Sequence, residues 1–368
     1  MSKYNIVLRL DSEYTNLGDK AIDLFAIEFF SKIGYLTIIA PDYGNFKKYI
    51  YPKLKGKLEE VIVIPDVIDI CRPKRFKRKL LRKLEVLLNI ISFLSISILP
   101  LSILTRLKNP KANLVASIRK ADVLVFSGGG YLNENWWRST LIPLLMLSII
   151  AKLHRIKVIL GPSSIGPIIT RKFKATLKLL FKIINLIYVR EPVSLAIAKD
   201  LYVDQAKIRL AKDWGYLNLF KFIINNNYNL RPSERIIAVH IRPWKEELEK
   251  EYYEAVWNKI ADLKPDFIQI ITMDLQEESH IRRFLEFIRN KGFPANHIEV
   301  VRAETYEDLL MNIKARTFIG MSFHFNILGY VMRGDLIPII VDDYYYIKLI
   351  GLRLLGIPFK ESIDLRLK

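Results

Sequence analysis

Residues with the chemistry of a binding or catalytic site stand just after short apolar runs, where strands are expected to end. The first group is Asn16, Gly18 and Asp19, in the segment NLGDKA. Gly18 permits a tight turn, and the carboxylate of Asp19 could take a proton from a hydroxyl group of a ligand. The alternative is that Asp19 only caps a helix beginning at Lys20. We take Asp19 as a candidate catalytic residue and Asn16 and Gly18 as candidate substrate-binding residues.

Three consecutive glycines, Gly128, Gly129 and Gly130, follow the apolar run at residues 123–126. Because glycine has no Cβ, such a run lets the backbone turn sharply and approach a ligand closely. Ligands of open α/β sheets bind outside the carboxyl ends of strands, which is where these glycines are expected. A tight turn without a ligand would have the same pattern. The three glycines are candidate substrate-binding residues.

Two further polar groups follow the next predicted strands. Ser163 and Ser164 lie in the segment GPSSIGP, and their hydroxyls suit phosphate or sugar oxygens, although a rigid loop is the simpler explanation. Arg190 and Glu191 end the run at residues 186–189. The guanidinium group of Arg190 could bind a phosphate or a carboxylate in a forked geometry, and the alternative is a structural Arg–Glu pair.

His324 and Arg242 are the corresponding candidates in the C-terminal half. His324 follows the apolar run at residues 317–320 and opens a helix, whose N-terminus favours anions. Arg242 ends the run at residues 236–241 and could face a substrate. A lone histidine is also common as a structural residue. The five histidines lack zinc-ligand spacing and the chain has one cysteine, so the sequence predicts no metal site.

The elements that would position these residues alternate along the chain. Apolar runs typical of strands are separated by helical patterns, which predicts parallel, doubly wound sheets. In the first half the predicted strands are residues 6–10, 36–39, 61–64, 123–126, 158–160 and 186–189. In the second half they are residues 236–241, 267–272, 298–301, 317–320 and 336–341. Two such domains facing each other would form a cleft, the usual place for a site with two substrates.

The polar segment NNNYNLRPS, at residues 225–233, is the best candidate for a linker. It predicts an N-terminal Rossmann-like domain at residues 1–225 and a C-terminal Rossmann-like domain at residues 226–342. A helical tail at residues 343–368 completes the predicted organisation.

An unusual insert occupies about residues 70–115 of the first domain. Residues 86–105 contain no charged side chain, and a dense group of lysines and arginines precedes them. The length suits a membrane span, but a single span would separate strands of one sheet. We therefore expect residues 72–111 to lie at an anionic membrane surface, held by apolar burial and basic charge. The alternative is a buried pair of helices that caps the first domain.

Composition sets wider bounds. The chain has 368 residues, 51% of them hydrophobic, so two domains with substantial cores are expected. A formal net charge of +19 favours anionic partners, but no nucleic-acid-binding motif is present, so we expect no nucleic-acid partner. The single cysteine and the lack of a signal-peptide pattern predict a cytoplasmic location. The absence of GxSxG, P-loop and GxGxxG patterns disfavours hydrolases, P-loop NTPases and dinucleotide enzymes.

Six blocks, taken in chain order, resemble the polysaccharide pyruvyl transferase family. They are NLGDKA at 16–21, GGGYL at 128–132, GPSSIGP at 161–167, VREPVS at 189–194, SFHF at 322–325 and DYYYIKLIGLRLLGIP at 343–358, which includes Lys348. The resemblance covers almost the whole chain apart from the insert. It implies a GT-B-like fold, with two Rossmann-like doubly wound domains facing a cleft. It also implies transfer of a carboxyvinyl group from phosphoenolpyruvate onto two hydroxyls of one sugar, giving a pyruvate ketal.

The resemblance also implies roles for particular residues. His324 matches the family's histidine near the donor, and Arg190 matches its arginine in the Arg-Glu block. In such a reaction the arginines and the histidine would hold the phosphate and the carboxylate of the donor. We take His324 and Arg190 as candidate catalytic residues, and Glu191 and Lys348 as candidate substrate-binding residues. Phosphoenolpyruvate would be a co-substrate, and no further cofactor is implied.

One position departs from the family pattern. Where the family usually has an arginine two residues before its histidine, this chain has Ser322. A serine cannot supply a charged fork to an anionic donor. Arg242 or another basic residue then takes over that function, or the donor differs, or activity is lost.

The sequence therefore predicts a transferase of the cell envelope that adds a pyruvyl ketal to a surface polysaccharide or a lipid-linked glycan. It would act in the cytoplasm, peripherally at the inner face of the cell membrane, with the glycan and the anionic membrane as its partners. Two alternatives stay open. One is a GT-B-type glycosyltransferase that uses a nucleotide sugar, and the other is a non-catalytic protein that binds glycans or lipid phosphates.

Overall fold

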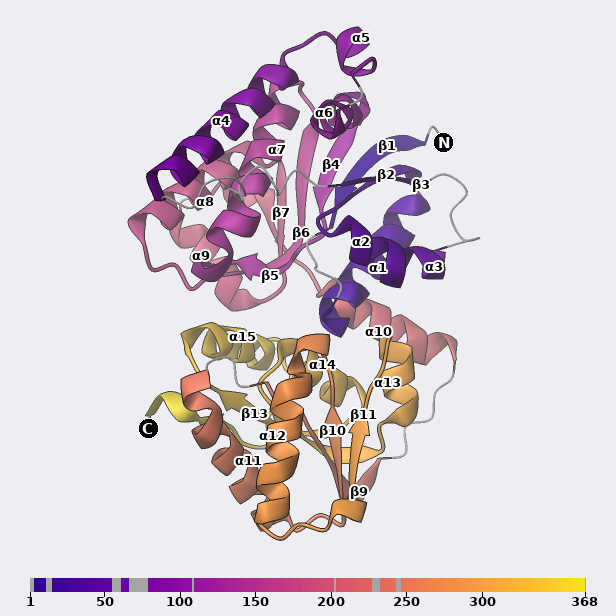
Figure 1. Cartoon of the computed structure of the whole chain (residues 1–368), viewed down its shortest axis with the longest axis vertical. Helices are drawn as coiled ribbons and strands as arrows, with labels where there is room; N and C mark the ends of the chain where they lie inside the picture. Colours follow the sequence, from indigo (N-terminus) through magenta and orange to yellow (C-terminus); the bar gives the residue numbers. More distant parts are fainter. Residues whose placement is uncertain are drawn as a thin grey trace. The chain divides into compact units, whose positions relative to one another are not determined.

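The computed structural model describes residues 3–10, 15–54, 61–65, 79–107, 109–201, 203–226, 232–242 and 246–367 (Figure 1). The chain divides into two compact units, each an α/β fold around its own parallel sheet. Unit 1 comprises residues 1–14 and 22–213, and unit 2 comprises residues 15–21 and 214–368. The expected α/β architecture with two Rossmann-like units is confirmed.

The limits of the two units differ from the predicted domains. The boundary predicted at 225/226 lies at 213/214, because helix α10 (Trp214–Asn225) packs Leu219 into the core of unit 2. The predicted linker lies partly outside the described residues, at 227–231. Residues 343–368 are not a separate tail, since β14 (Ile363–Asp364) pairs with β13 (Asp335–Ile340). Residues 15–21 belong to unit 2, which no local pattern predicted.

The sheet of unit 1 has the strand order β3-β2-β1-β4-β6-β7-β8, with β5 pairing with β6. The strands are β1 (Tyr4–Arg9), β2 (Gly34–Ala40), β3 (Val61–Pro65), β4 (Val123–Phe126), β5 (Gly129–Leu132), β6 (Lys157–Ile165), β7 (Leu186–Val189) and β8 (Ile208–Leu210). The direction of strand addition reverses between β1 and β4, and such a reversal is where open α/β sheets place their ligands.

Helices cover the sheet of unit 1. Helix α8 shows why they form: Thr170 caps its N-terminus, and Phe173, Leu177, Leu180 and Phe181 place one apolar stripe in the core. The other helices here are α1 (Leu17–Ser31), α2 (Tyr43–Asn45), α3 (Tyr51–Leu54), α6 (Pro110–Lys120), α7 (Ile142–Leu153) and α9 (Pro192–Asp200). The first turn of α1 belongs to unit 2 and the rest to unit 1.

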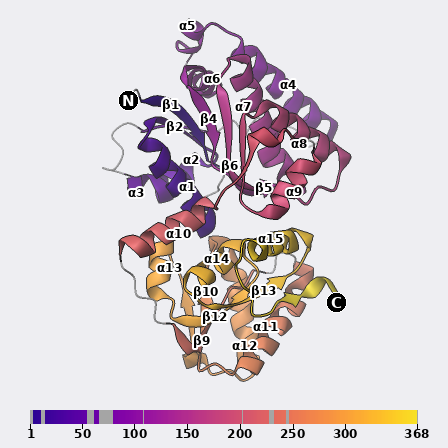
Figure 2. The same ribbon diagram turned by 180° about the vertical axis from the view of Figure 1, so that it is seen from behind.

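Unit 2 repeats the same topology with the strand order β11-β10-β9-β12-β13-β14 (Figure 2). Its strands are β9 (Ser233–Val239), β10 (Phe267–Ile271), β11 (Ile298–Val301), β12 (Ala315–Gly320), β13 and β14. Its helices are α10, α11 (Glu249–Leu263), α12 (Glu278–Asn290), α13 (Tyr306–Asn312), α14 (Phe323–Val331) and α15 (Asp343–Leu354). The reversal point of this sheet lies between β9 and β12.

The predicted insert is partly core and partly surface. Its described residues form α4 (Lys79–Ser97), α5 (Leu101–Leu104) and the first turn of α6, whereas residues 66–78 and Lys108 of the basic clusters lie outside the described residues. Phe93 and Leu104 are fully buried in the core of unit 1, but Ile98 is 74% exposed. The expectation of a buried helix pair is therefore right for one face of the insert and wrong for the other.

Among the described helical residues, one stretch, Glu134–Leu153, is long and apolar enough to cross a membrane by length and composition. It ends in α7, whose Leu144, Leu147 and Ile150 are fully buried in the core of unit 1. These contacts are those of a core helix covering a sheet.

Candidate functional site

The strands of unit 2 bring several predicted residues to the reversal point of its sheet. His240 and Arg242 follow β9, and Ser322 and His324 follow β12, the strand that pairs with β9. Asp274 follows β10, on the other side of β9. Because parallel strands end at the same edge, these side chains gather at one edge of the sheet, as the sequence predicted for Arg242 and His324.

The N-terminal motif joins this edge although it is far away in the sequence. The Leu17 amide donates a hydrogen bond of 2.8 Å to the Met273 carbonyl, and Asn16 forms an isolated bridge with Asp274. The Asn16 side-chain oxygen accepts hydrogen bonds from the amides of Gly18 and Asp19 at 2.8 and 3.3 Å. Asn16 therefore caps α1, and the alternative in which Asp19 is the cap is wrong.

Gly18 is held against His324 so closely that only glycine fits. A Cβ placed on Gly18 would lie 2.0 Å from Nδ1 of His324 and 2.3 Å from its Cγ. His324 is 7% exposed, and it lies in the first turn of α14 with its ring edge-on to Phe323. The closeness of the two residues explains why the N-terminal motif needs a glycine at this position.

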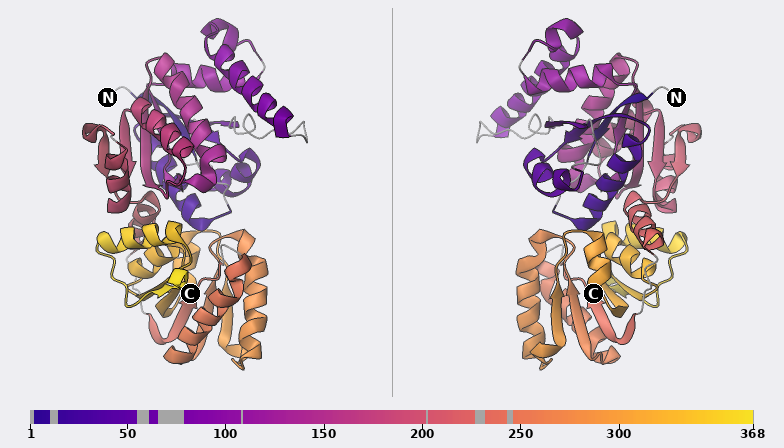
Figure 3. Two further views of the ribbon diagram at one scale, coloured as in Figure 1. Left: turned by 90° about the vertical axis from the view of Figure 1, so that its left-hand side faces the viewer. Right: turned by 90° about the vertical axis from the view of Figure 1, so that its right-hand side faces the viewer.

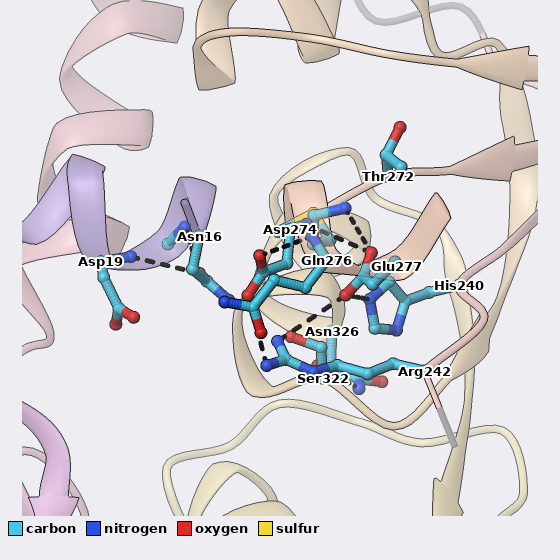
Figure 4. A network of polar contacts seen from close by, with 12 residues as sticks. Asn16, Asp19, His240, Arg242, Thr272, Asp274, Gln276, Glu277, Ser322 and Asn326 are labelled. Atoms are coloured by element: carbon cyan, nitrogen blue, oxygen red, sulfur yellow. Dashed lines mark hydrogen bonds and ion pairs between the residues drawn. The ribbon is translucent and has the colours of Figure 1, made fainter. Parts of the chain in front are cut away.

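Arg242 is held by acidic side chains of the same edge (Figure 4). Its guanidinium lies 3.3 Å from Asp274 and 3.7 Å from Glu277, and its side chain is 22% exposed. Burial lowers the pKa of Arg242, but Tyr345, Glu277 and Asp274 raise it more, so the net pKa lies above the ordinary value. Arg242 is therefore charged, and part of its charge is already neutralised by the protein.

Glu277 connects Arg242 to His240. Nε2 of His240 lies 3.0 Å from the carboxylate of Glu277, and both side chains are buried. Glu277 also closes a capping box by accepting a 3.2 Å hydrogen bond from the Asp274 amide, and it accepts a second one, of 2.9 Å, from the Met273 amide. Burial raises the pKa of Glu277. The charge and the hydrogen bond of His240 and the charge of Arg242 together lower this pKa by more, so the net pKa lies below the ordinary value.

We expect Glu277→Gln to reduce the free energy of unfolding at neutral pH by about 2 kcal/mol, the usual contribution of hydrogen bonds to a charged group. Because the folded-state pKa of Glu277 is lowered, its contribution is present above the ordinary value of 4.5 and is lost as the pH falls through the lower folded-state pKa. Urea unfolding, repeated from pH 7 down to a pH below the folded-state pKa, measures the free energy of unfolding of the wild type and of Glu277→Gln. The difference between the two free energies should become smaller in acid. A difference that does not change with pH would contradict the role of the Glu277 charge.

The N-terminus of α14 faces the same edge through Ser322. Ser322 is the N-cap residue of α14, but within the described residues its hydroxyl makes no capping hydrogen bond. The Asn326 side-chain amide instead donates to the carbonyls of Ser322 and Gly320, at 2.8 and 3.2 Å, and so fixes the loop between β12 and α14. A helix N-terminus favours a negatively charged group, so this loop can bind an anion even without an arginine at residue 322.

A cavity of about 70 Å³ lies beside these residues and shares Asp274 with them. Thr15, Lys20, Thr272 and Arg302 supply polar groups to its wall. Lys20 is buried here, whereas the sequence suggested only that a helix begins at this residue.

Arg190, Glu191 and Ser164 lie together within unit 1. Arg190 donates to the Ser164 hydroxyl at 2.6 Å and to the Asp213 carboxylate at 2.8 Å, and it lies 3.5 Å from Glu191. Glu191 accepts a hydrogen bond from the Ser194 hydroxyl. Arg190 and Glu191 are 1% and 0% exposed, so these groups hold one another in the interior of unit 1. This geometry matches the alternative of a structural Arg–Glu pair.

The serine segment and the last two glycines of the run are parts of strands. Residues 161–165 continue β6, and the Ser163 hydroxyl donates to the Gly161 carbonyl. Gly129 and Gly130 begin β5, which pairs with β6 at Ser163. Between β4 and β5 the strand pattern breaks only at Ser127 and Gly128, so the glycines lead into a further strand of the same sheet.

Gly128 makes a close approach, but to the chain itself. It has a φ of +88°, and a Cβ at this position would lie 2.6 Å from the Pro162 carbonyl oxygen. The neighbouring backbone thus explains the glycine without a ligand.

Lys348, in α15 of unit 2, is buried, and its ammonium hydrogen-bonds to the Tyr344 hydroxyl.

Sequence reasoning missed several buried partners. Asp213, Asp274, Glu277 and His240 carried no motif, and Arg9, fully buried at the end of β1, stands at the reversal point of unit 1. A signal was present for Arg9 and His240, since each directly follows or ends an apolar run. In the described residues, no three His, Cys, Asp or Glu side chains are grouped so that they could hold a metal ion.

The comparisons with known proteins agree on family and fold. A family model described as polysaccharide pyruvyl transferase matches residues 43–343. No curated protein sequence gives a significant match. Similar solved structures include a putative UDP-N-acetylglucosamine 2-epimerase from Listeria monocytogenes, with 10% identity, a TM-score of 0.55 and coverage of 97% of this chain and 89% of that chain.

Two further solved structures have the same fold. HepE from Anabaena, solved in complex with UDP and glucose, has 11% identity and a TM-score of 0.53, covering 91% of this chain and 81% of that one. A glycosyltransferase from Rickettsia africae has 13% identity and a TM-score of 0.53, covering 92% and 80% of the two chains. At these identities the likeness establishes the GT-B-like fold alone.

Proposed function

The chain belongs to the polysaccharide pyruvyl transferase family, and from this premise we propose that it transfers a pyruvyl group from phosphoenolpyruvate to two hydroxyls of one sugar. The family assignment itself supports the broader statement of a polysaccharide-modifying transferase. The donor, the ketal product and the roles of individual residues belong to the proposal.

The proposed reaction has a simple balance. An acid protonates the CH₂ carbon of phosphoenolpyruvate, which becomes a methyl group and leaves the neighbouring carbon electrophilic. One sugar hydroxyl adds to that carbon as a base takes its proton, the phosphate leaves, and the second hydroxyl takes the place of the phosphate. Of the two hydroxyl protons, one replaces the proton given to the methyl group and the other leaves with the phosphate.

The residues at the edge of unit 2 suit the donor part of this reaction. His324, in the first turn of α14, and the N-terminal amides of that helix are suited to the phosphate or the carboxylate of the donor. We assign Arg242 to the position left by the serine at residue 322, and Asp19 to the base that accepts a hydroxyl proton. Because Asp274 and Glu277 already contact Arg242, it would orient the donor more than attract it.

One observation supports the proposal most directly. Gly18, from the N-terminal family block, touches His324, from the block near the C-terminus, in the same unit. Two blocks that resemble the family, and that are about 300 residues apart in the sequence, thus meet at the reversal point of one sheet, where ligands of such sheets bind. The family model matches the second block but begins only at residue 43. Arg190, Glu191, Ser163 and Ser164 are better explained as the buried frame of unit 1, since they hold one another.

The test is calorimetric titration of phosphoenolpyruvate into the purified protein and into His324→Ala. We expect saturable binding to the wild type and its loss in the variant, because a charge-assisted contact to the donor disappears. His297→Ala is the matched control, since His297 is an exposed histidine of the same unit and should not change binding.

The other outcomes point elsewhere. If the folded wild type binds a nucleoside diphosphate sugar and not phosphoenolpyruvate, the protein is a glycosyltransferase of the same fold. If phosphoenolpyruvate binds equally well to His324→Ala, the site assignment is wrong. Binding of glycan alone, with neither donor, indicates a non-catalytic binding protein.

For the acceptor we propose a surface polysaccharide or a lipid-linked saccharide, met in the cytoplasm at the inner face of the cell membrane. The net charge of +19 supports an acceptor or a surface that carries negative charge. No nucleic-acid partner and no cofactor beyond the donor are part of the proposal.

A further inference from the structure

We propose that unit 1 docks on an anionic lipid bilayer through one face of α4 and α5, and this inference does not depend on the identity of the donor. We call this surface the α4–α5 apolar face. It consists of five large apolar side chains that are each between 44% and 74% exposed: Leu87, Leu88, Ile91, Ile98 and Ile103.

Three of these residues share one side of α4, because Leu87 and Leu88 lie one turn before Ile91. Ile98 directly follows the last residue of α4, and Ile103 belongs to α5. The other exposed residues between Leu87 and Ile103 are Ser92, Ser95, Pro100 and Ser102, and residues 86–105 contain no charge. A helix on the surface of a protein in water normally has charged and polar residues on this side.

The other side of α4 and α5 is already used. Phe93 and Leu104 are fully buried, and Ile90 and Ile96 pack against the same core of unit 1. Figure 3 shows α4, in purple, at the periphery of unit 1. The helix is therefore anchored to the unit by one face and presents the α4–α5 apolar face outward.

The geometry favours an interfacial position over a span. The apolar part of α4, Leu87–Ser97, is about 16 Å long at 1.5 Å per residue, about half of the 30 Å hydrocarbon core. Strands that precede and follow the insert belong to one sheet, since β1 pairs with β4 from Ile6 with Val123 to Arg9 with Phe126. Because both ends of the insert return to one sheet, the segment has to lie on one side of the bilayer.

The charges around the α4–α5 apolar face indicate that an anionic lipid surface binds there. Lysines and arginines flank the apolar residues on both sides, and Glu85 is the only acidic residue between residues 72 and 111. Lys79, Arg82 and Lys83 belong to the first turns of α4, and Arg106 follows α5 as an exposed residue. An apolar stripe bordered by basic residues is the pattern of helices that lie in an anionic membrane interface.

The experiment is co-sedimentation of the full-length protein with vesicles of phosphatidylcholine and phosphatidylglycerol in equal parts, and with phosphatidylcholine alone. We expect binding to the anionic vesicles and at least about a 10-fold weaker binding for the double variant Ile91→Asn, Ile98→Asn. Both side chains are at least half exposed, so the variant should fold and unfold like the wild type.

Ile169→Asn is the matched control, because Ile169 is 76% exposed in unit 1 but lies outside the α4–α5 apolar face. It should bind vesicles as the wild type does. An equal loss in the control, an unchanged double variant, or no binding of the wild type would each overturn the proposal. Sedimentation velocity tests whether a second copy of the chain covers this face instead. If the wild type is a dimer that does not bind vesicles, and the double variant is a monomer, the face is a dimer interface.

Donor binding in solution separates this proposal from the proposed function. Calorimetry with phosphoenolpyruvate needs no membrane, so the double variant should bind the donor as the wild type does. Loss of vesicle binding with intact donor binding leaves the proposed function untouched.

Discussion

Replacing Asp213 by alanine should lower the free energy of unfolding of unit 1 by about 3 kcal/mol or more. The Asp213 carboxylate lies 2.8 Å from the Arg190 guanidinium, and the two side chains are 5% and 1% exposed. Without Asp213 the arginine keeps its charge in the interior, with Glu191 at 3.5 Å as the remaining acidic partner. Removing one partner of a buried ion pair costs far more than the pair contributes, because the other charge stays desolvated.

Urea unfolding followed by tryptophan fluorescence measures this change. Asp266→Ala is the control: Asp266 pairs with Arg235 at the surface, where the side chains are 48% and 77% exposed, and exposed pairs contribute at most about 1 kcal/mol. The triple variant Arg190→Met, Glu191→Gln, Asp213→Leu should recover part of the loss, since it removes all three buried charges. If Asp213→Ala loses no more stability than Asp266→Ala, the buried network is not a structural frame.

Replacing Gly18 by alanine should weaken the binding of phosphoenolpyruvate by about 100-fold, which corresponds to the loss of one hydrogen bond to a charged group. The new Cβ would lie 2.0 Å from Nδ1 of His324, so the histidine ring or the 15–21 segment has to move. His324 would then no longer point where the donor needs it. The same titration that tests His324 measures this effect.

Gly334→Ala separates the loss of donor binding from general overpacking. A Cβ on Gly334 would lie 2.5 Å from the Phe318 side chain, which is also in unit 2 but outside the candidate site. We expect Gly334→Ala to lower the stability of unit 2 and to leave the affinity for the donor unchanged. The double variant Gly18→Ala, His324→Ala should regain the stability that Gly18→Ala loses through the clash with the histidine ring, but it should still not bind phosphoenolpyruvate. If Gly18→Ala binds phosphoenolpyruvate as the wild type does, the close contact between residues 18 and 324 is refuted.

The strands were the easiest part of the fold to predict from the sequence. The runs at residues 123–126, 186–189 and 298–301 coincide with β4, β7 and β11 because each is a short apolar stretch between turn residues. β6 is longer than predicted since Pro162 suggested the end of a strand. The pairing of β6 with β7 shifts register between Leu160 and Ser163, and such an irregularity accommodates a proline inside a strand.

The site was predictable where a residue follows a strand, and unpredictable where it depends on distant contacts. His324 and Arg242 could be found because parallel strands deliver their carboxyl ends to one edge. The partnership of Gly18 with His324 and of Arg190 with Asp213 could not, because no local pattern records which side chains meet after folding. For the same reason Asp19 was considered as a helix cap, a role that Asn16 has.

The placement of residues 15–21 in unit 2 has a consequence for how this protein can be divided. A fragment starting at residue 214 would contain every strand of unit 2 and still lack Leu17 in its core and Gly18 beside His324. Chimaeras joined once between residues 213 and 214 would combine Gly18 and His324 from two different parents. During synthesis, the N-terminal motif also leaves the ribosome long before its partners at residues 273 and 324 exist, so these contacts can form only after residue 324 has been made.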